Sequence, residues 1–454
     1  MKRTRLFLIL LSVVGILQAC KKENVESNLA PQPSTPAAVS VADKFKDTAL
    51  AYSKDIYLWY NQIPANFDAR SFADLEKLMT GLRQYSTEPG FSQPVDRWSF
   101  AIKKTEWDNI SSGIAGDFGI SVFFMAPGDL RVKSVEQESP AGKAGIRRGW
   151  RITKVAGSTD IISSNADFLV SKIYNSSNTS FSFQKPDNST QDITLTSATY
   201  MENPILLDSI YTVGSKKIGY LSYNSFLGDT AKTYSEFQRI FNRFAAQNVN
   251  DVVVDLRYNG GGYVTVQSKL ANYLVNNSGN GGLMMKQQYN DKYPQYNSTN
   301  NFKKLGSLDL NRVFFIVSNN TASASELLIN NLKPYMQVKL IGPSKTYGKP
   351  VGYFNIPVGD SYIFPVSFRT TNKNGEGNYF DGFPLDAQVA DGLDKDWGDL
   401  NESALAAAVR YITTGAARLA TTTPYVENLE VSRANTILSA PSFRGAIDPR
   451  KSVR

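Results

Sequence analysis

The chain has 454 residues, of which 42% are hydrophobic, 12% aromatic and 20% charged. This length predicts more than one domain, and this composition excludes a wholly disordered or collagen-like chain. The net charge is +8, but no long basic run indicates a nucleic-acid partner. Histidine is absent and cysteine occurs once, which excludes Ser-His and Cys-His catalysis, His-ligated metals, an internal disulfide and a thiolate zinc site. A nucleophile in this chain would need a base other than histidine.

The N-terminus is typical of a secretory signal, because basic residues at positions 2, 3 and 5 precede the apolar run 6–17. That run has about twelve residues, too few to span a bilayer. The following Leu-Gln-Ala-Cys order resembles a bacterial lipobox, which implies a signal peptide over residues 1–19 and a lipid anchor on Cys20. The resemblance implies an envelope lipoprotein, and the absence of Asp after Cys20 favours the outer membrane. It leaves open whether the protein faces the periplasm or the cell surface, and its oligomeric state.

Composition and periodicity divide the rest of the chain. Residues 20–40 are rich in Pro, Ser, Ala and Asn and predict a flexible tether after the anchor. Apolar residues at helical spacing predict two or three helices in a small N-terminal domain, 41–112. Strands and helices alternate in residues 201–420, which predicts an α/β domain containing a long loop at 279–301. Residues 421–454 lack periodicity and predict a poorly ordered C-terminal tail.

Residues 113–200 contain short β-rich runs around the Ser-Pro-Ala and Ala-Gly-Ile segments of 139–146. This order resembles a PDZ domain. In that family a peptide adds as a strand to a sheet edge, and its C-terminal carboxylate binds backbone N–H groups of a glycine-containing loop. The resemblance implies that Phe118, Gly119 and Ile120 bind peptide here. A plain β-turn is the alternative interpretation of this loop.

A serine-rich segment, Thr-Ala-Ser-Ala-Ser-Glu at 321–326, lies between an apolar strand and an apolar-periodic helix. Such a strand-to-helix turn exposes a hydroxyl beside a helix N-terminus. An ordinary helix N-cap is the alternative, and Ser325 fits that role best. Two further segments favour catalysis. Residues 255–262 end a buried strand with three glycines, whose N–H groups could approach an oxyanion. Lys349 lies between a glycine and a proline, where a cramped backbone can hold its amine inward, and a desolvated lysine loses its proton more readily.

Together these segments resemble the C-terminal processing (tail-specific) serine protease family, in which a helical N-terminal domain and an inserted PDZ domain accompany a Ser-Lys core. The resemblance extends from Asp-Arg-Trp-Ser at 96–99 to Gly-Phe-Pro-Leu-Asp at 382–386. It implies a multidomain α+β protein with an α/β (ββα-type) protease core. It also implies a polypeptide substrate and a reaction that needs no cofactor or metal.

The same resemblance assigns the site residues. It implies Ser323 as the nucleophile, Lys349 as the general base, and the backbone N–H groups of Gly261 and Ala324 as the oxyanion hole. Many family members carry a Gln four residues after the lysine to orient it, and this chain has Tyr353 there. Tyrosine can hydrogen-bond in place of that Gln.

Two other functions fit parts of the sequence. Because Tyr353 replaces the family Gln, the protein could be a catalytically dead, PDZ-containing peptide-binding envelope lipoprotein. The abundance of aromatic residues alone suggests a glycan-binding lipoprotein. Acidic residues between 394 and 402 loosely resemble a calcium loop, but an intervening Trp-Gly pair breaks the EF-hand order, so we expect a solvated helix start there instead.

Overall fold

The structure is a computed structural model that describes residues 39–416, 429–439 and 443–449. The predicted signal peptide, Cys20 and nearly all of the predicted tether lie outside the described residues. All helices and strands reported below belong to the unit formed by residues 41–454.

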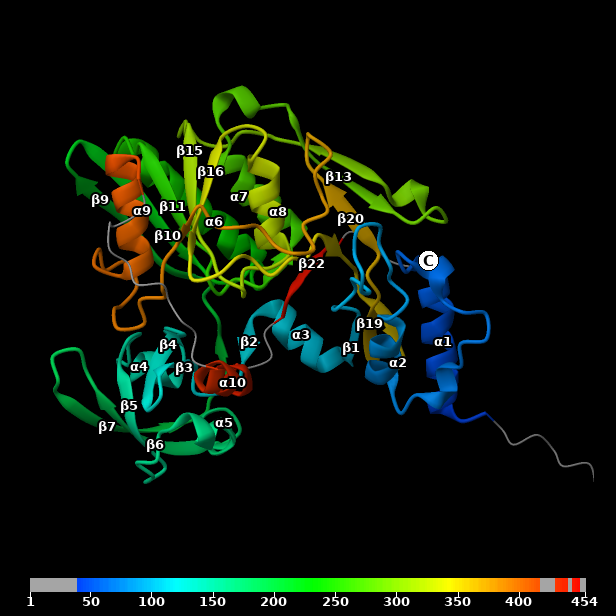
Figure 1. The fold of residues 1–454 in the computed structure, drawn as a ribbon, viewed down its shortest axis with the longest axis horizontal. Coiled ribbons are helices and arrows are strands. Elements are labelled where there is room, and N and C mark those ends of the chain that lie inside the picture. The colour runs from blue at the N-terminus through cyan, green and yellow to red at the C-terminus, as the bar shows by residue number, and fades with distance from the viewer. Residues whose placement is uncertain (1–38, 417–428, 440–442, 450–454) are drawn as a thin grey trace, which may run out of the picture. The chain divides into compact units, whose positions relative to one another are not determined.

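The largest sheet has six strands in the order β21-β16-β15-β11-β10-β9 (Figure 1). The first two strands along the chain, β9 and β10, are antiparallel, and the remaining pairs are parallel. Parallel strands joined by helices are what the predicted alternation of strands and helices requires. The strands are β9 (Ile205–Val213), β10 (Lys216–Tyr223), β11 (Asp251–Asp255), β15 (Arg312–Ile316), β16 (Gln337–Gly342) and β21 (Ala387–Gln388).

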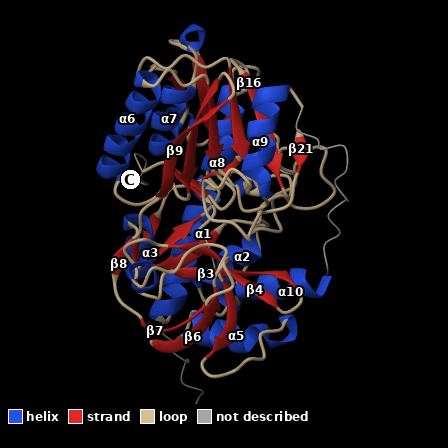
Figure 2. Cartoon of the chain, turned by 90° about the vertical axis from the view of Figure 1, so that its left-hand side faces the viewer, coloured by secondary structure: helices blue, strands red, loops and turns tan. Residues whose placement is uncertain are grey.

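Helices cover both faces of this sheet (Figure 2). In β11, Val252 and Val254 pack into one apolar core and Val253 packs into another. This alternation follows from the period of two in a strand, and the continuous apolar run reflects burial on both sides. The first core contains side chains from α6 (Thr230–Ala246), α7 (Val264–Leu274) and α8 (Ala324–Leu332), and the second contains side chains from α9 (Ser403–Thr414).

The N-terminal helices share the first of these cores. Leu78 of α2 and Ile56 at the end of α1 are fully buried in it. A strand from the same region, β1, pairs antiparallel with β19, which lies far along the chain. The elements are α1 (Val41–Ile56), α2 (Leu75–Leu82), β1 (Phe100–Lys103), α3 (Lys104–Ser112), β18 (Ile356–Val358) and β19 (Ser361–Phe364), with single 3₁₀ turns at Tyr60–Gln62 and Ala69–Ser71.

The region expected to resemble a PDZ domain has a core of its own. Five antiparallel strands in sequence order form its sheet, so β3 is an edge strand. The elements are β3 (Ile120–Ala126), β4 (Asp129–Val135), α4 (Pro140–Lys143), β5 (Arg151–Val155), a 3₁₀ turn at Ser163–Asn165, α5 (Ala166–Ile173), β6 (Asn178–Gln184) and β7 (Thr190–Thr196). A short pair, β2 (Ile114–Ala115) and β8 (Tyr200–Met201), joins the ends of this region.

Two segments contradict the sequence prediction. The stretch 279–301, expected to be an unpatterned loop, contains the antiparallel pair of β13 and β14. Its pattern was hidden because polar Gln287 is fully buried in a strand of otherwise apolar inward residues. The expected tail contains a helix and a strand, α10 and β22. The elements are β12 (Gly261–Tyr263), β13 (Leu283–Tyr289), β14 (Ser298–Asn301), β17 (Val351–Gly352), β20 (Phe368–Thr371), α10 (Leu429–Leu438) and β22 (Gly445–Ile447), with 3₁₀ turns at Asn277–Gly279 and Pro294–Tyr296.

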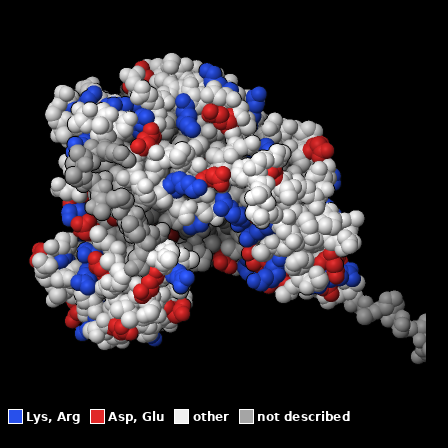
Figure 3. Space-filling view, in the orientation of Figure 1, with Lys and Arg blue, Asp and Glu red and all other residues white. Residues whose placement is uncertain are grey.

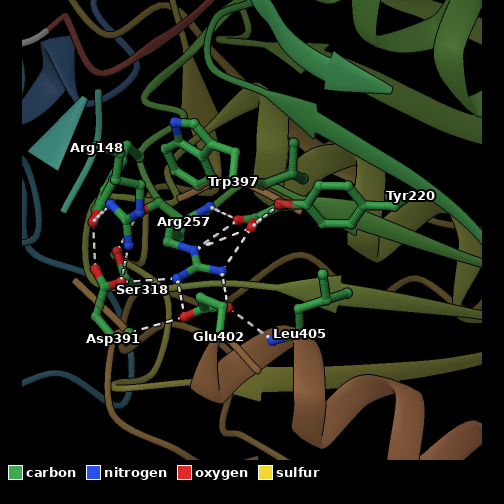
Figure 4. A network of polar contacts seen from close by, with 12 residues as sticks. Arg148, Tyr220, Arg257, Ser318, Asp391, Trp397, Glu402 and Leu405 are labelled. Carbon is green, nitrogen blue, oxygen red and sulfur yellow. Dashed lines mark hydrogen bonds and ion pairs between the residues drawn. The ribbon is translucent and has the colours of Figure 1, made fainter. Parts of the chain in front are cut away.

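A buried ionic network joins the β-rich region to the loop after β11 (Figure 4). The Arg257 side chain is 1% exposed and forms ion pairs with Asp255, Asp391 and Glu402. Arg148, from the β-rich region, is fully buried and contacts the same Asp391 at 2.6 Å. Buried charges persist only when they are paired and hydrogen-bonded, so each member depends on the others.

The acidic segment before α9 is a helix start, but Glu402 is not solvated as expected. Glu402 is the buried N-cap of α9, and its carboxylate accepts a hydrogen bond from the N–H of Leu405 at 2.9 Å. Its charge is balanced by Arg257, which lies too far away in sequence for the expectation to have included it.

The described surface carries charges of both signs. On the face shown in Figure 3, Lys and Arg side chains are interspersed with Asp and Glu. The excess positive charge is therefore not gathered into one patch on that face. Among the residues that the structure describes, no helix is long and apolar enough to cross a membrane.

The buried network predicts that replacing two different arginines lowers the stability of the protein by very different amounts. Replacing Arg257 with Met leaves the buried carboxylates of Asp255 and Glu402 without their cation, and we expect the free energy of unfolding to fall by about 3–5 kcal/mol. The control Arg239→Met removes exposed ion pairs to Asp208 and Glu236 and should cost at most about 1 kcal/mol. Urea denaturation monitored by tryptophan fluorescence measures the free energy of unfolding of both variants. Equal losses of stability would contradict this account of the network.

Candidate active site

Ser323 lies at the start of α8, in the turn that follows β15. Its backbone has φ 58° and ψ −106°, a strained conformation for a residue with a side chain. The residue is 1% exposed, and its Oγ has no hydrogen-bond partner of good geometry in the described part of the chain. A buried hydroxyl without a partner, held in a strained strand-to-helix turn, is an arrangement typical of a nucleophile.

The expectation that Ser325 caps this helix is wrong. The helix begins at Ala324, so Ser323 is the N-cap residue and Ser325 lies inside the first turn. The hydroxyl of Ser325 donates a hydrogen bond to the carbonyl of Asn259 at 3.0 Å, which ties the helix to the loop after β11.

A single carboxylate joins the segments of Ser323 and Lys349. Glu326 is fully buried, and its Oε2 accepts hydrogen bonds from the backbone N–H groups of Ser323 and Lys349, each at 2.8 Å. Its Oε1 accepts from the N–H of Gly348 and the hydroxyl of Thr346, each at 2.6 Å. Burial raises the pKa of Glu326, and these four hydrogen bonds oppose that shift. The two predicted catalytic residues are thus fixed at adjacent positions by one side chain.

Lys349 is 1% exposed, so the predicted inward lysine is present. Its Nζ donates a hydrogen bond to the carbonyl of Arg444 at 2.9 Å and lies 3.6 Å from the ring centroid of Tyr353 and 5.6 Å from that of Trp98. Burial lowers the pKa of Lys349 well below 10.5, while nearby carboxylates oppose this shift. A neutral amine can accept a proton from a hydroxyl, as a general base must.

Tyr353, at the position of the family Gln, contacts the lysine differently from the expected hydrogen bond. The face of its ring lies against the Lys349 amine, and its hydroxyl donates to the carbonyl of Arg444 at 2.9 Å. The amine and the phenol therefore share one acceptor. Tyr353 holds the amine by ring contact rather than through its hydroxyl.

The two predicted oxyanion-hole residues lie close together. A Cβ atom built on Gly261 would lie 3.0 Å from the backbone nitrogen of Ala324. The Ala324 nitrogen is in the first turn of α8, where N–H groups have no acceptor within the helix and the helix dipole favours negative charge. The N–H of Gly261 instead donates to the side-chain oxygen of Asn259 at 2.9 Å. Ala324 is therefore the better placed of the two predicted donors.

Two motifs that carried the family resemblance contact the loop 343–350, which contains Lys349 and is called the lysine loop below. Arg97 donates hydrogen bonds to the carbonyls of Gly348 and Phe380 at 3.3 and 3.2 Å. The N–H of Phe383 donates to the hydroxyl of Thr346 at 2.7 Å. Sequence reasoning did not assign these contacts or Glu326, although the Ser-x-x-Glu spacing of 323–326 is the signal of a helix capping box.

The predicted peptide-binding loop is tightly folded. Phe118 and Ile120 are buried in the core of the β-rich region. Gly119 has φ 76°, and its N–H donates to the carboxylate of Asp117 at 2.7 Å. An acceptor within the chain therefore binds the N–H of Gly119 in this structure.

Comparison with known proteins gives a family match for part of the chain. Residues 217–383 match the model of peptidase family S41. The chain is 28% identical over 260 residues to a "Probable CtpA-like serine protease" of Staphylococcus aureus strain N315, covering 56% of this chain and 49% of that protein. A protein with the same description from Staphylococcus saprophyticus is 26% identical over 259 residues, with 56% and 50% covered. The chain spans about half the length of the curated relatives it matches.

The fold is also found in a solved structure. The crystal structure of a putative S41 protease from Bacteroides fragilis has a TM-score of 0.65 to this chain at 23% identity, covering 81% of this chain and 97% of that one. The family model and the curated relatives point to the same class of protein, the serine-type peptidases of family S41, as what this chain resembles. The chain carries a peptidase family S41 domain and has CtpA-like serine proteases among its homologues.

The strained turn gives a testable difference between two variants. Ser323→Ala and Ser323→Gly both remove the hydroxyl, but only glycine adopts a positive φ without strain. We expect the Gly variant to be more stable than the Ala variant by about 1 kcal/mol. Chemical denaturation of the two purified variants measures the difference. An Ala variant as stable as the Gly variant would show that this turn is not strained.

Proposed function

We propose that this protein is a serine endopeptidase that hydrolyses polypeptides through Ser323 and Lys349, with no cofactor or metal. The observation that carries the proposal is the Glu326 carboxylate, which binds the backbone N–H groups of both residues. The unpartnered Ser323 hydroxyl and the desolvated Lys349 amine supply the two functions that acyl transfer needs.

In the proposed mechanism, neutral Lys349 takes the proton of Ser323 Oγ as that oxygen attacks the peptide carbonyl. Negative charge develops on the carbonyl oxygen, and the N–H of Ala324 at the start of α8 can stabilise it. The lysine then protonates the leaving amine, and a water molecule hydrolyses the acyl-enzyme with Lys349 again as base. Before the reaction, the Lys349 amine must break its hydrogen bond to the carbonyl of Arg444.

The β-rich region is proposed to be a PDZ domain that binds extended or C-terminal polypeptide segments. Its five-stranded antiparallel sheet with β3 at the edge supports this, since a peptide adds as a strand to such an edge. The proposed location is the cell envelope, with Cys20 lipidated and the protein held at the outer membrane. That part of the proposal rests on the N-terminal sequence alone.

A catalytically dead peptide-binding lipoprotein is the second candidate. It is favoured by one observation, that Tyr353 replaces the family Gln and shares an acceptor with the lysine amine. The two functions differ in whether Ser323 and Lys349 are needed for turnover.

Removal of either proposed catalytic side chain should abolish hydrolysis. Ser323→Ala and Lys349→Met are each expected to lower kcat/KM on casein at least about 100-fold, because the nucleophile or its base is lost. Lys345→Met, in an exposed position of the same loop, is the control and should keep full activity. A Ser323→Ala protein that still cleaves casein would exclude the proposed nucleophile.

The buried lysine also predicts a pH dependence. A general base must be unprotonated, and the pKa of Lys349 is lowered below 10.5, so kcat/KM should rise with pH and level off above that lowered pKa. Initial rates on a fluorogenic peptide from about pH 6 to about pH 9 measure the profile. A flat profile would count against Lys349 as the titrating base.

A further inference from the structure

The described C-terminal residues contact the β-rich region and the catalytic residues in turn. Helix α10 lies beside β3 in Figure 1 and packs on β3 and α5. Its residues Val431, Ala434 and Leu438 are at most 3% exposed and belong to the core of the β-rich region.

Helix α10 also takes the hydrogen-bonding groups of the β3 edge. The N–H of Phe124 donates to the Asn435 side-chain oxygen at 2.7 Å, and the Asn435 amide donates to the Phe124 carbonyl at 3.0 Å. Two residues earlier in β3, the N–H of Val122 donates to the hydroxyl of Tyr174, the residue after α5, at 3.1 Å. A peptide that added as a strand would need these same groups, so it would have to displace α10.

The following strand, β22, lies against the catalytic residues. It pairs in parallel with β12, with Gly261 opposite Gly445, and the N–H of Gly445 donates to the carbonyl of Gly260 at 3.0 Å. On its other side, the N–H of Tyr353 donates to the carbonyl of Ala446 at 3.0 Å. The segment thus lies extended between β12 on one side and Tyr353 on the other, as a substrate chain would.

The glycines of the β11–β12 loop are what allow this approach. A Cβ on Gly260 would lie 2.0 Å from the carbonyl oxygen of Phe443, and one on Gly261 would lie 2.3 Å from that of Gly445. Any other residue at either position would therefore exclude the segment in its present place.

The segment also binds the proposed base. The carbonyl of Arg444 accepts hydrogen bonds from Lys349 Nζ and the Tyr353 hydroxyl, each at 2.9 Å. The Ser323 Oγ has no hydrogen-bond partner of good geometry within the described ranges; the backbone of Glu326 approaches it only as a weak capping contact. The Lys349 amine is thus already hydrogen-bonded to the segment.

We propose that residues 429–439 and 443–449 form an intramolecular inhibitor that covers the β3 edge with α10 and the catalytic residues with β22. A polypeptide substrate then competes with a ligand of the same chain, whose effective concentration is high because it is tethered. The inference rests on the proposed peptidase function for its effect on turnover, but not for the binding itself.

Adjacent residues on opposite faces of α10 test the helix. Leu438 is 1% exposed and Ile437 is 47% exposed. Leu438→Asp places a carboxylate in the contact with the β-rich region and should raise kcat/KM on casein at least about fivefold by releasing the segment. The control Ile437→Asp makes the same change on the exposed face and should leave turnover unchanged.

A second variant tests the strand and covers the case in which Leu438→Asp does not fold. Gly445→Pro removes the N–H that donates to Gly260, so β22 should detach, with a similar rise in turnover. If thermal melts show that both variants are folded and neither turns over casein faster than the wild type, the inhibitor is excluded.

A binding measurement separates this inference from the proposed peptidase function. A fluorescein-labelled synthetic peptide of residues 429–449 is titrated into full-length Ser323→Ala and into the Ser323→Ala, Gly445→Pro double variant, and its anisotropy is followed. We expect the double variant to bind at least about tenfold more tightly, because its own segment no longer competes. If no variant cleaves casein but this difference is found, the peptidase function fails and the intramolecular ligand stands. Equal binding to both proteins would overturn the intramolecular ligand.

Discussion

The buried carboxylate of Glu326 is the interaction on which the rest of the site depends. An ionised carboxylate in a core is costly, and here four hydrogen bonds from two distant chain segments compensate for its burial. Those bonds fix the start of α8 against the lysine loop to within the length of one side chain. The proposed proton transfer between Ser323 and Lys349 requires that precision, which neither segment could provide alone.

The other parts of the site protect this arrangement. Arg97 holds the lysine loop from outside, and Phe383 binds the same Thr346 that contacts the carboxylate. The aromatic rings of Trp98 and Tyr353 line the lysine amine and keep water from it. Desolvation lowers the pKa of Lys349, so the hydrophobic core shared by the N-terminal helices and the sheet would contribute directly to the proposed chemistry.

Sequence reasoning succeeded where the information is local. The apolar run of β11 and the helical periodicity of α6 to α8 are read from neighbouring residues. The roles of Ser323 and Lys349 came from the family resemblance and stay predictions. Sequence reasoning failed where a distant partner decides the outcome. Helix α10 has only three buried apolar residues with partners roughly 300 positions away, and Gln287 is buried in β13. Arg257 likewise decides the state of Glu402 from another part of the chain.

The C-terminal segment makes its two contacts within about twenty residues, and this closeness has a thermodynamic consequence. Because α10 and β22 belong to one short stretch, release at the β3 edge weakens the hold at β12, and release at β12 weakens the hold at β3. Linkage requires the two effects to be equal in size. A polypeptide that binds the β3 edge with one part of its chain and β12 with another would therefore bind the two places cooperatively. This cooperativity needs no hinge between the two sheets. Only a ligand long enough to occupy both places would gain from this coupling, so the protein would bind long polypeptides in preference to short ones.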